Sequence, residues 1–279
     1  MRKGQNLVRN SRGVALIIVL LVTALLIALI FEFAYGTRVS LRAAANYRNS
    51  QRAYFLARSG FGVFARFPDV RGYSRQGELS LPVPYVSEGD KVLQLLWEDE
   101  SGKINITNIS KGNDAYNRLT NLFLILQIDQ NIIDEMSRWQ SQEQRGFYLL
   151  TELHRFLSDE DYGKVEKFLT VSTTDNKINI NTASSQVLQS LGFSAPDAAK
   201  IAESAQQEPY GSSTKPINSA PGVTTMIASQ LVASSNVYKV RSVATVGAVD
   251  GVGGYKKQID VIMTLGGLNG YTVNYWRAL

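Results

Sequence analysis

The sequence predicts an α+β fold in which one long N-terminal helix packs on an antiparallel sheet, and a large all-α domain is inserted between the strands of that sheet. Three observations predict it. An uncharged apolar run near the N-terminus continues without proline into an amphipathic segment. Segments with the period of β-strands follow it and also end the chain, and the stretch between them has the spacing of short helices. Strands on both sides of a helical stretch are expected to form one interrupted sheet.

The apolar run covers residues 14–31 and carries one hydroxyl and no charge. Eighteen residues at about 1.5 Å each give about 27 Å of helix, enough to cross a hydrocarbon core of about 30 Å. The leader at residues 1–13 contains no acid and four basic residues: Arg2, Lys3, Arg9 and Arg12. We therefore expect a cytoplasmic N-terminus and an exported remainder. The whole helix is expected over residues 14–67, because Pro68 disfavours helix at the residue before it.

A secretory signal peptide and a simple membrane anchor are the two ordinary interpretations of this segment. The apolar core of a signal peptide is only about 7–15 residues long and ends at a small-residue cleavage site. Here the run is longer and continues as helix. Gly13 stands directly between Arg12 and the apolar run, and this arrangement resembles the prepilin signal, which a membrane peptidase cuts after the glycine. The resemblance implies cleavage between Gly13 and Val14, with N-methylation of Val14.

The amino-acid composition of the chain excludes some kinds of binding site and of partner. The chain has no cysteine, which excludes disulfides and thiolate zinc sites in an exported protein. Its net charge of +5 includes the four positive charges of the leader, so a processed chain is close to neutral and the charge does not indicate nucleic-acid binding. A local positive bias follows the apolar run, with six arginines and no acid between residues 37 and 67. These arginines form either a solvated face or a docking stripe for acidic neighbours.

The sheet is expected to form from residues 68–102 and 236–279. The predicted strands are residues 79–86, 91–98, 237–246, 258–265 and 271–276. Residues 103–235 are predicted to be the inserted helical domain. It contains a weak repeat, KINITNIS at residues 103–110 and KININTAS at residues 177–184, and each copy precedes an apolar helical pattern with Asn, Thr or Ser as a natural N-cap.

Candidate chemistry is sparse, and we expect a protein that is not an enzyme. His154 is the only histidine, and a lone histidine without cysteine makes a poor transition-metal site. No serine, histidine and acid arrangement has supporting spacing. The metal candidate is calcium at Glu98, Asp99 and Glu100, because calcium prefers carboxylate oxygens. Exposed acids in a turn are the ordinary alternative, and no other cofactor is expected.

The phrase KININTAS also resembles the opening of helix-hairpin-helix domains, including those of membrane-anchored DNA-uptake receptors. Such domains point backbone N–H groups of a glycine-rich hairpin at a phosphate. The corresponding hairpin at residues 192–196 has one glycine and a bulky Phe193, and few basic residues flank it. Phosphate contacts supply most non-specific DNA affinity. A membrane-anchored DNA-binding protein is therefore the alternative function, and no nucleic acid is expected as a partner.

Several segments together resemble a type II secretion minor pseudopilin of the K class. They are RGVALIIVLL at residues 12–21, AYFLARSG at 53–60, DESGKINI at 99–106, KININTAS and its helix, and YTVNYWRAL at 271–279. The resemblance implies a pilin-like fold and a subunit of the periplasmic pseudopilus in a Gram-negative bacterium. It implies a single-pass inner-membrane protein with a periplasmic C-terminal domain. The implied partners are other minor pseudopilins, the prepilin peptidase and the inner-membrane secretion platform.

One departure from ordinary pilins is informative. Most pilins carry a glutamate shortly after the cleavage site, and Ile18 occupies that place here. The family's glutamate is thought to neutralise the N-terminal amine of the subunit above it, and a buried unpaired charge costs several kcal/mol. A subunit at the filament tip has no subunit above it. The absence of the acid therefore fits a tip position, and the resemblance implies a tip subunit that initiates assembly for the export of folded proteins across the outer membrane.

Overall fold

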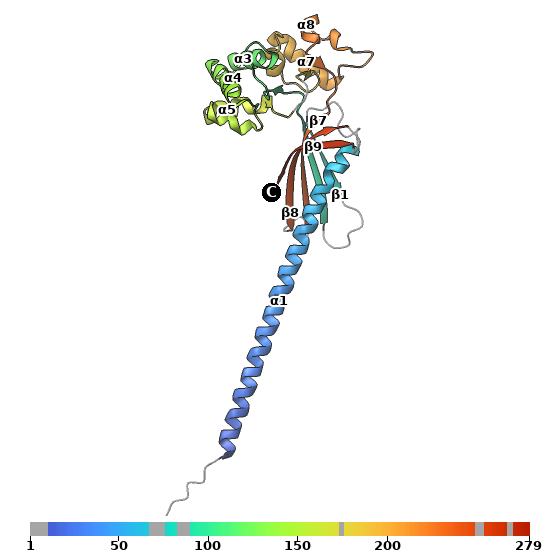
Figure 1. The fold of residues 1–279 in the computed structure, drawn as a ribbon. Helices are drawn as coiled ribbons and strands as arrows, with labels where there is room; N and C mark the ends of the chain where they lie inside the picture. The colour runs from blue at the N-terminus through green and yellow to red at the C-terminus, as the bar shows by residue number, and fades with distance from the viewer. Residues whose placement is uncertain (1–10, 67–75, 83–89, 173–175, 249–253, 267–269) are drawn as a thin grey trace, which may run out of the picture. The chain divides into compact units, whose positions relative to one another are not determined.

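The structure is a computed structural model that describes residues 11–66, 76–82, 90–172, 176–248, 254–266 and 270–279 (Figure 1). The chain divides into two compact units, Met1–Arg52 and Ala53–Leu279, which we describe separately. Helix α1, Ser11–Arg66, begins in the first unit and ends in the second. The predicted leader cleavage at Gly13 lies inside its first turn, and most of the leader lies outside the described residues.

The first unit contains the apolar part of α1. Among the described residues, this is one helix that is long and apolar enough to cross a membrane. The only hydroxyl of the apolar run, on Thr23, lies 2.9 Å from the carbonyl oxygens of both Val19 and Leu20 and donates within the helix. The apolar side chains of the run are exposed. A continuous apolar surface of this length needs lipid or neighbouring helices to cover it, which fits a single-pass anchor.

A five-stranded antiparallel sheet forms the centre of the second unit (Figure 1). Its strands in spatial order are β1 (Gln76–Pro82), β2 (Asp90–Asp99), β7 (Val237–Ala248), β8 (Tyr255–Leu265) and β9 (Tyr271–Ala278). The prediction of one sheet built from both sides of the insert is confirmed, because β2 pairs with β7, with Leu95 opposite Ser242. The first strand begins three residues earlier than predicted, and the predicted turn before β2 lies largely outside the described residues.

The last turns of α1 cover one face of this sheet. Phe61 and Phe64 are buried there with Leu95 and Trp97 of β2. Phe64 packs edge to face on Tyr238, with ring centroids 5.4 Å apart. Small residues allow this close approach, because a Cβ at Gly60 would lie 2.3 Å from Ser242 Oγ. These contacts confirm the predicted packing of the long helix on the sheet.

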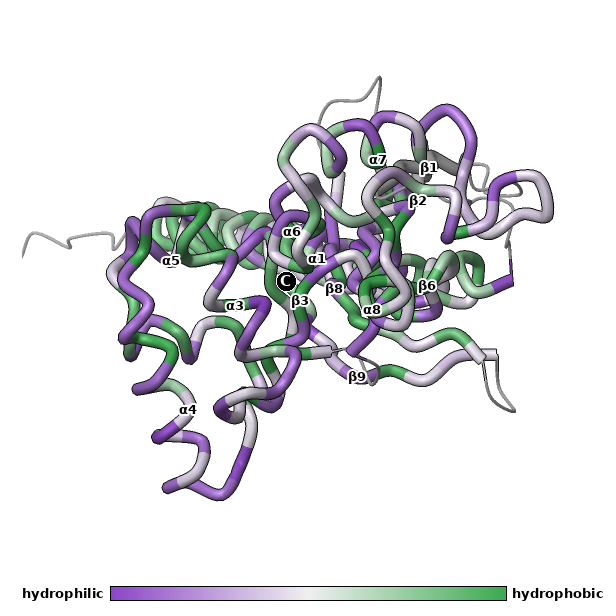
Figure 2. Tube along the Cα trace, turned by 90° about the horizontal axis from the view of Figure 1, so that it is seen from above, coloured by the Kyte–Doolittle hydropathy of each residue, from purple (hydrophilic) through white to green (hydrophobic). Residues whose placement is uncertain are grey.

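The inserted segment joins the sheet where β2 ends and β7 begins. Its helices are α3 (Asp114–Ile125), α4 (Asn131–Glu143), α5 (Asp159–Val165), α6 (Ser185–Ser190), α7 (Ala195–Gln207) and α8 (Thr225–Ala228). Short 3-10 turns occur at Leu150–Arg155, Glu166–Phe168 and Ile217–Ser219. Hydrophobic and hydrophilic residues alternate along the insert (Figure 2), as expected for short helices with one buried face. The predicted N-caps are present: Asn113 accepts from the Tyr116 N–H at 2.8 Å, and Ser184 caps α6.

Besides its helices, the insert contains short strands that the sequence did not predict. Two short parallel ladders run through it: β3 (Ile104–Asn105) with β4 (Leu169–Thr170), and β5 (Ile178–Asn179) with β6 (Leu231–Val232). Two-residue strands carry too little periodicity to be recognised in a sequence. The insert also has its own hydrophobic core, built around residues such as Leu122, Phe123 and Leu188.

Candidate functional site

The repeated phrase forms the same local structure twice. In each copy an Ile-Asn pair makes the short parallel ladder, and the following Ile N–H, of Ile106 or Ile180, donates 2.9 Å to the carbonyl of the partner strand. The side chain of the Asn residue then stabilises a turn of the backbone. The Oδ1 atom of Asn105 accepts from the Thr107 N–H, and that of Asn179 accepts from the Asn181 N–H. The weak sequence repeat is therefore a structural repeat.

The insert has two halves, which begin with the copies of the phrase at residues 103–110 and 177–184, and the two halves pack against each other. Helix α3 of the first half lies on α6 of the second. The Arg118 guanidinium of α3 is buried, and it donates to Gln230 Oε1 at 2.9 Å and to the Asn176 carbonyl. An arginine that satisfies acceptors on the second half fixes how the two halves meet.

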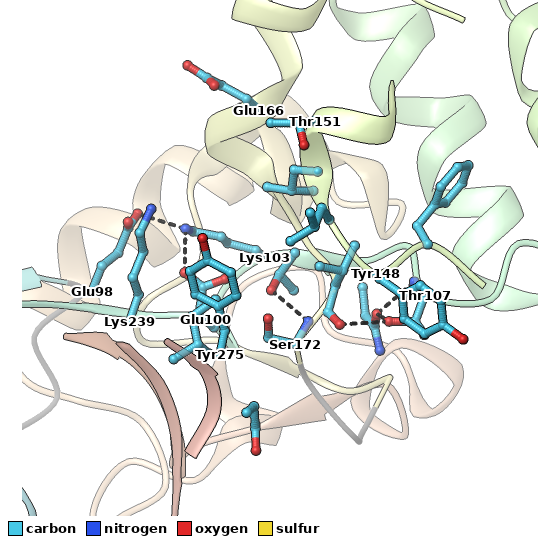
Figure 3. Close-up of a pocket in the computed structure, with 18 of the residues that line it drawn as sticks. Glu98, Glu100, Lys103, Thr107, Tyr148, Thr151, Glu166, Ser172, Lys239 and Tyr275 are labelled. Carbon is cyan, nitrogen blue, oxygen red and sulfur yellow. Dashed lines mark hydrogen bonds and ion pairs between the residues drawn. The ribbon is translucent and has the colours of Figure 1, made fainter. Parts of the chain in front are cut away.

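The acidic triplet lies where the sheet passes into the insert. Glu98 and Asp99 end β2, and Glu100 begins the turn that follows. The ammonium group of Lys103 lies 3.1 Å from Glu98 and 2.8 Å from Glu100 (Figure 3). Burial lowers the pKa of Lys103, but attraction to Glu100 and Glu98 outweighs it, so the pKa lies above its ordinary value of 10.5. Two of the three predicted calcium ligands thus form ion pairs with Lys103.

Asp99 has different partners. Its side chain is buried, and its Oδ1 atom accepts from the Ser101 N–H at 2.8 Å and from the Ser235 hydroxyl. Its Oδ2 atom accepts from Asn179 Nδ2 at 3.0 Å and from the Thr182 hydroxyl at 2.5 Å. Burial is the largest influence on the pKa of Asp99 and raises it above 3.8, while the four hydrogen bonds act in the opposite direction.

The predicted calcium site is not assembled by these contacts. Glu98 and Glu100 form ion pairs with Lys103, and Asp99 accepts hydrogen bonds from hydroxyl and amide groups. Among the residues that the structure describes, no group of three or more His, Asp and Glu side chains is placed to hold a metal ion. Calcium binding at this triplet stays a prediction. The partners of Asp99 were missed because they lie far along the chain, and only the repeated phrase around Asn179 gave a signal.

A groove of about 1210 Å³ lies between the first half of the insert and the sheet face opposite α1. Lys239, Tyr275 and Arg277 line it from β7 and β9, and Tyr148 and Thr107 line it from the insert (Figure 3). Its charges are mixed, since the acidic triplet's Glu98 and Glu100 also face it. The groove is open and amphipathic, which suits contact with a protein surface better than capture of a small ligand.

His154 lies at the surface of the insert. Its ring stacks on Tyr162 at 3.9 Å, and its Nδ1 atom lies 3.1 Å from the exposed carboxylate of Asp159. These contacts are those of a surface histidine that packs on a neighbouring ring. The second candidate binding element, the hairpin between α6 and α7, contains Gly192 with φ of +104°, and Phe193 beside it is buried in the insert's core.

The predicted processing site lies on α1. Gly13 has open space around the position of a Cβ, and Val14 and Ile18 are both exposed. Exposure is what a peptidase site and a filament contact both need. Cleavage after Gly13, methylation of Val14 and the role of Ile18 stay predictions.

The fold is similar to that of a chain in the crystal structure of the GspK-GspI-GspJ complex from the type 2 secretion system of enterotoxigenic Escherichia coli. The TM-score is 0.53 at 15% sequence identity, and the match covers 87% of this chain and 99% of the other. No protein-family model and no curated protein matches the sequence. The long helix, the antiparallel sheet and the insert thus form a fold similar to that of a chain in this complex.

Proposed function

We propose that this chain is a minor pseudopilin of the K class, a non-enzymatic subunit at the tip of a type II secretion pseudopilus. The observation that carries the proposal is one continuous helix, which begins with an exposed apolar run and ends on a pilin-like sheet that bears a large insert. The similarity to a chain of a complex of three pseudopilins supports this role and supports other minor pseudopilins as partners.

The long helix determines the order of cleavage, membrane anchoring and assembly. Prepilin peptidase cuts between Gly13 and Val14 and methylates the new amine, while residues 14–31 hold the subunit in the inner membrane with its C-terminal domain in the periplasm. The secretion platform then brings it together with other minor pseudopilins through helix packing. Because Ile18 supplies no carboxylate for a subunit above it, the chain occupies the tip and starts the filament.

The insert supports a tip position by its bulk. Residues 103–235 form about half of the chain and have a separate core. Extra volume of this kind is easiest to place at the end of a filament, where no following subunit competes for the space.

The processing step is tested by mass spectrometry of the full chain expressed with and without a prepilin peptidase. We expect a mature chain that begins at Val14 only with the peptidase, and no mature chain from Gly13→Leu. A mature product of the same mass from Gly13→Leu, or an intact Met1 in the native material, would refute the proposal. Gly36→Leu is the matched control, since Gly36 lies on the same helix with open space around it and should leave processing unchanged.

A further inference from the structure

The insert and the sheet have separate hydrophobic cores. One core is built from the helices and short ladders of the insert, and the other from the end of α1 and strands β2, β7 and β8. Among the described residues, no side chain belongs to both. Two domains that share no apolar interface are expected to move relative to each other. What restrains them must therefore be found in the polar contacts at the junction.

Asp99 lies at the centre of that junction. It is the last residue of β2 and still pairs with Tyr238 in the sheet, yet its carboxylate receives hydrogen bonds from the insert. Asn179 and Thr182 donate from the second repeat, and Ser235 donates from the segment by which the chain returns to the sheet. One buried carboxylate thus joins the outgoing strand, the insert and the returning strand.

Backbone contacts around Asp99 hold the same segments together. The Asn179 N–H donates 2.8 Å to the Ser101 carbonyl, and the Glu100 N–H donates 3.0 Å to the Val237 carbonyl. Gly102 lies directly on the second repeat, where an added Cβ would be 2.8 Å from the carbonyl carbon and oxygen of Thr182. Such an approach is open only to a glycine, because backbone atoms cannot move aside as a side chain can.

We propose that Asp99 acts as a clasp that fixes the orientation of the helical insert on the sheet. Hydrogen bonds to a charged acceptor are stronger and more directional than neutral ones. Donors from three separated segments can satisfy one carboxylate only when the two domains stand in one relative orientation. Because each domain has its own core, opening the clasp frees their orientation while leaving both domains folded. This inference does not depend on the proposed function.

The test measures a distance across the junction by pulsed electron paramagnetic resonance on the full chain in detergent micelles. The natural chain has no cysteine, so Thr272→Cys on β9 and Lys200→Cys on α7 give two labels without background. Both positions are exposed. We expect a narrow distance distribution in the parent, and one about twofold wider or more in Asp99→Ala, as for domains without a fixed interface.

Two further variants make the outcome decisive. Thr182→Val with Ser235→Ala removes two donors but keeps the carboxylate, and it should also widen the distribution. Asp161→Ala is the control, since the side chain of Asp161 accepts hydrogen bonds from Ser158, the N-cap of α5, and from Lys164 within the same helix. It should leave the width unchanged. An unchanged width in Asp99→Ala and in the double variant would overturn the proposal, as would loss of folding in both, because the clasp would then maintain the fold rather than the orientation.

Discussion

Phe64 provides the sharpest test of how α1 is attached to the sheet. Its side chain is 1% exposed and packs on two rings, Tyr238 at 5.4 Å and Trp97 at 5.7 Å between centroids. Replacing a buried phenylalanine by alanine costs about 3–5 kcal/mol, which includes the lost transfer free energy and the cavity that remains. The two ring contacts contribute about 0.5–1.5 kcal/mol each to this loss. We therefore expect Phe64→Ala to reduce the free energy of unfolding of the sheet domain by about 3–5 kcal/mol.

Phe55→Ala is the matched control on the same helix. Phe55 is 59% exposed, and its removal should change the free energy of unfolding by no more than about 0.5 kcal/mol. The assay is denaturant unfolding of the full chain in detergent micelles. It is followed by the fluorescence of Trp97, with Trp139 and Trp276 replaced by phenylalanine in every variant compared. Equal losses in the two variants, or a loss below about 1 kcal/mol in Phe64→Ala, would refute the packing of α1 on the sheet.

The remaining predictions concern the tip role, acid stability, calcium and DNA. Ile18→Glu should give no gain in secretion by the complete system, since a tip subunit needs no carboxylate; a gain would contradict the tip position. Burial raises the pKa of Glu152, but Arg145 at 2.8 Å and two backbone N–H groups outweigh it, so the pKa lies below 4.5. The stabilisation by ionised Glu152 is present above the unfolded-state pKa and is lost as the pH falls through the lower folded-state pKa. Glu152→Gln should therefore show a smaller fall in melting temperature below about pH 4.5 than the parent does, and equal curves would exclude this role. If calcium binds the triplet, it should raise the melting temperature relative to a chelator, and an unchanged melting temperature would show that the ion pairs of Lys103 take the place of the ion. The purified chain should not retard duplex DNA at low salt, and a salt-dependent retardation would favour the helix-hairpin-helix alternative.

The elements with strong periodicity could be predicted from the sequence. The apolar run and the absence of proline predicted the long helix. The alternation of apolar and polar residues predicted β7, β8 and β9 close to their observed bounds. The sequence predicted that strands on both sides of the insert share one sheet, and the structure adds that β2 and β7 are the neighbours that join them. The two parallel ladders of the insert were missed, because a strand of two residues is shorter than one period of any pattern.

The role of the acidic triplet could not be predicted, for a physical reason. A carboxylate in a turn has the same sequence signal whether it binds a cation, faces water or accepts hydrogen bonds from distant segments. The donors to Asp99 lie 80, 83 and 136 residues away in Asn179, Thr182 and Ser235. Only the fold brings these donors to Asp99, and the repeated phrase around Asn179 was the one signal of them in the sequence.

The order in which the strands pair has a consequence for folding while the chain is made from its N-terminus. Strand β2 is made early, but its neighbour β7 follows only after the entire insert. Until then β2 presents an open row of backbone donors and acceptors, which invites aggregation. The insert can collapse around its own core meanwhile, and by shortening the connection it lowers the entropy cost of bringing β7 back. A destabilised insert would then be detected first as aggregated or degraded newly made chains.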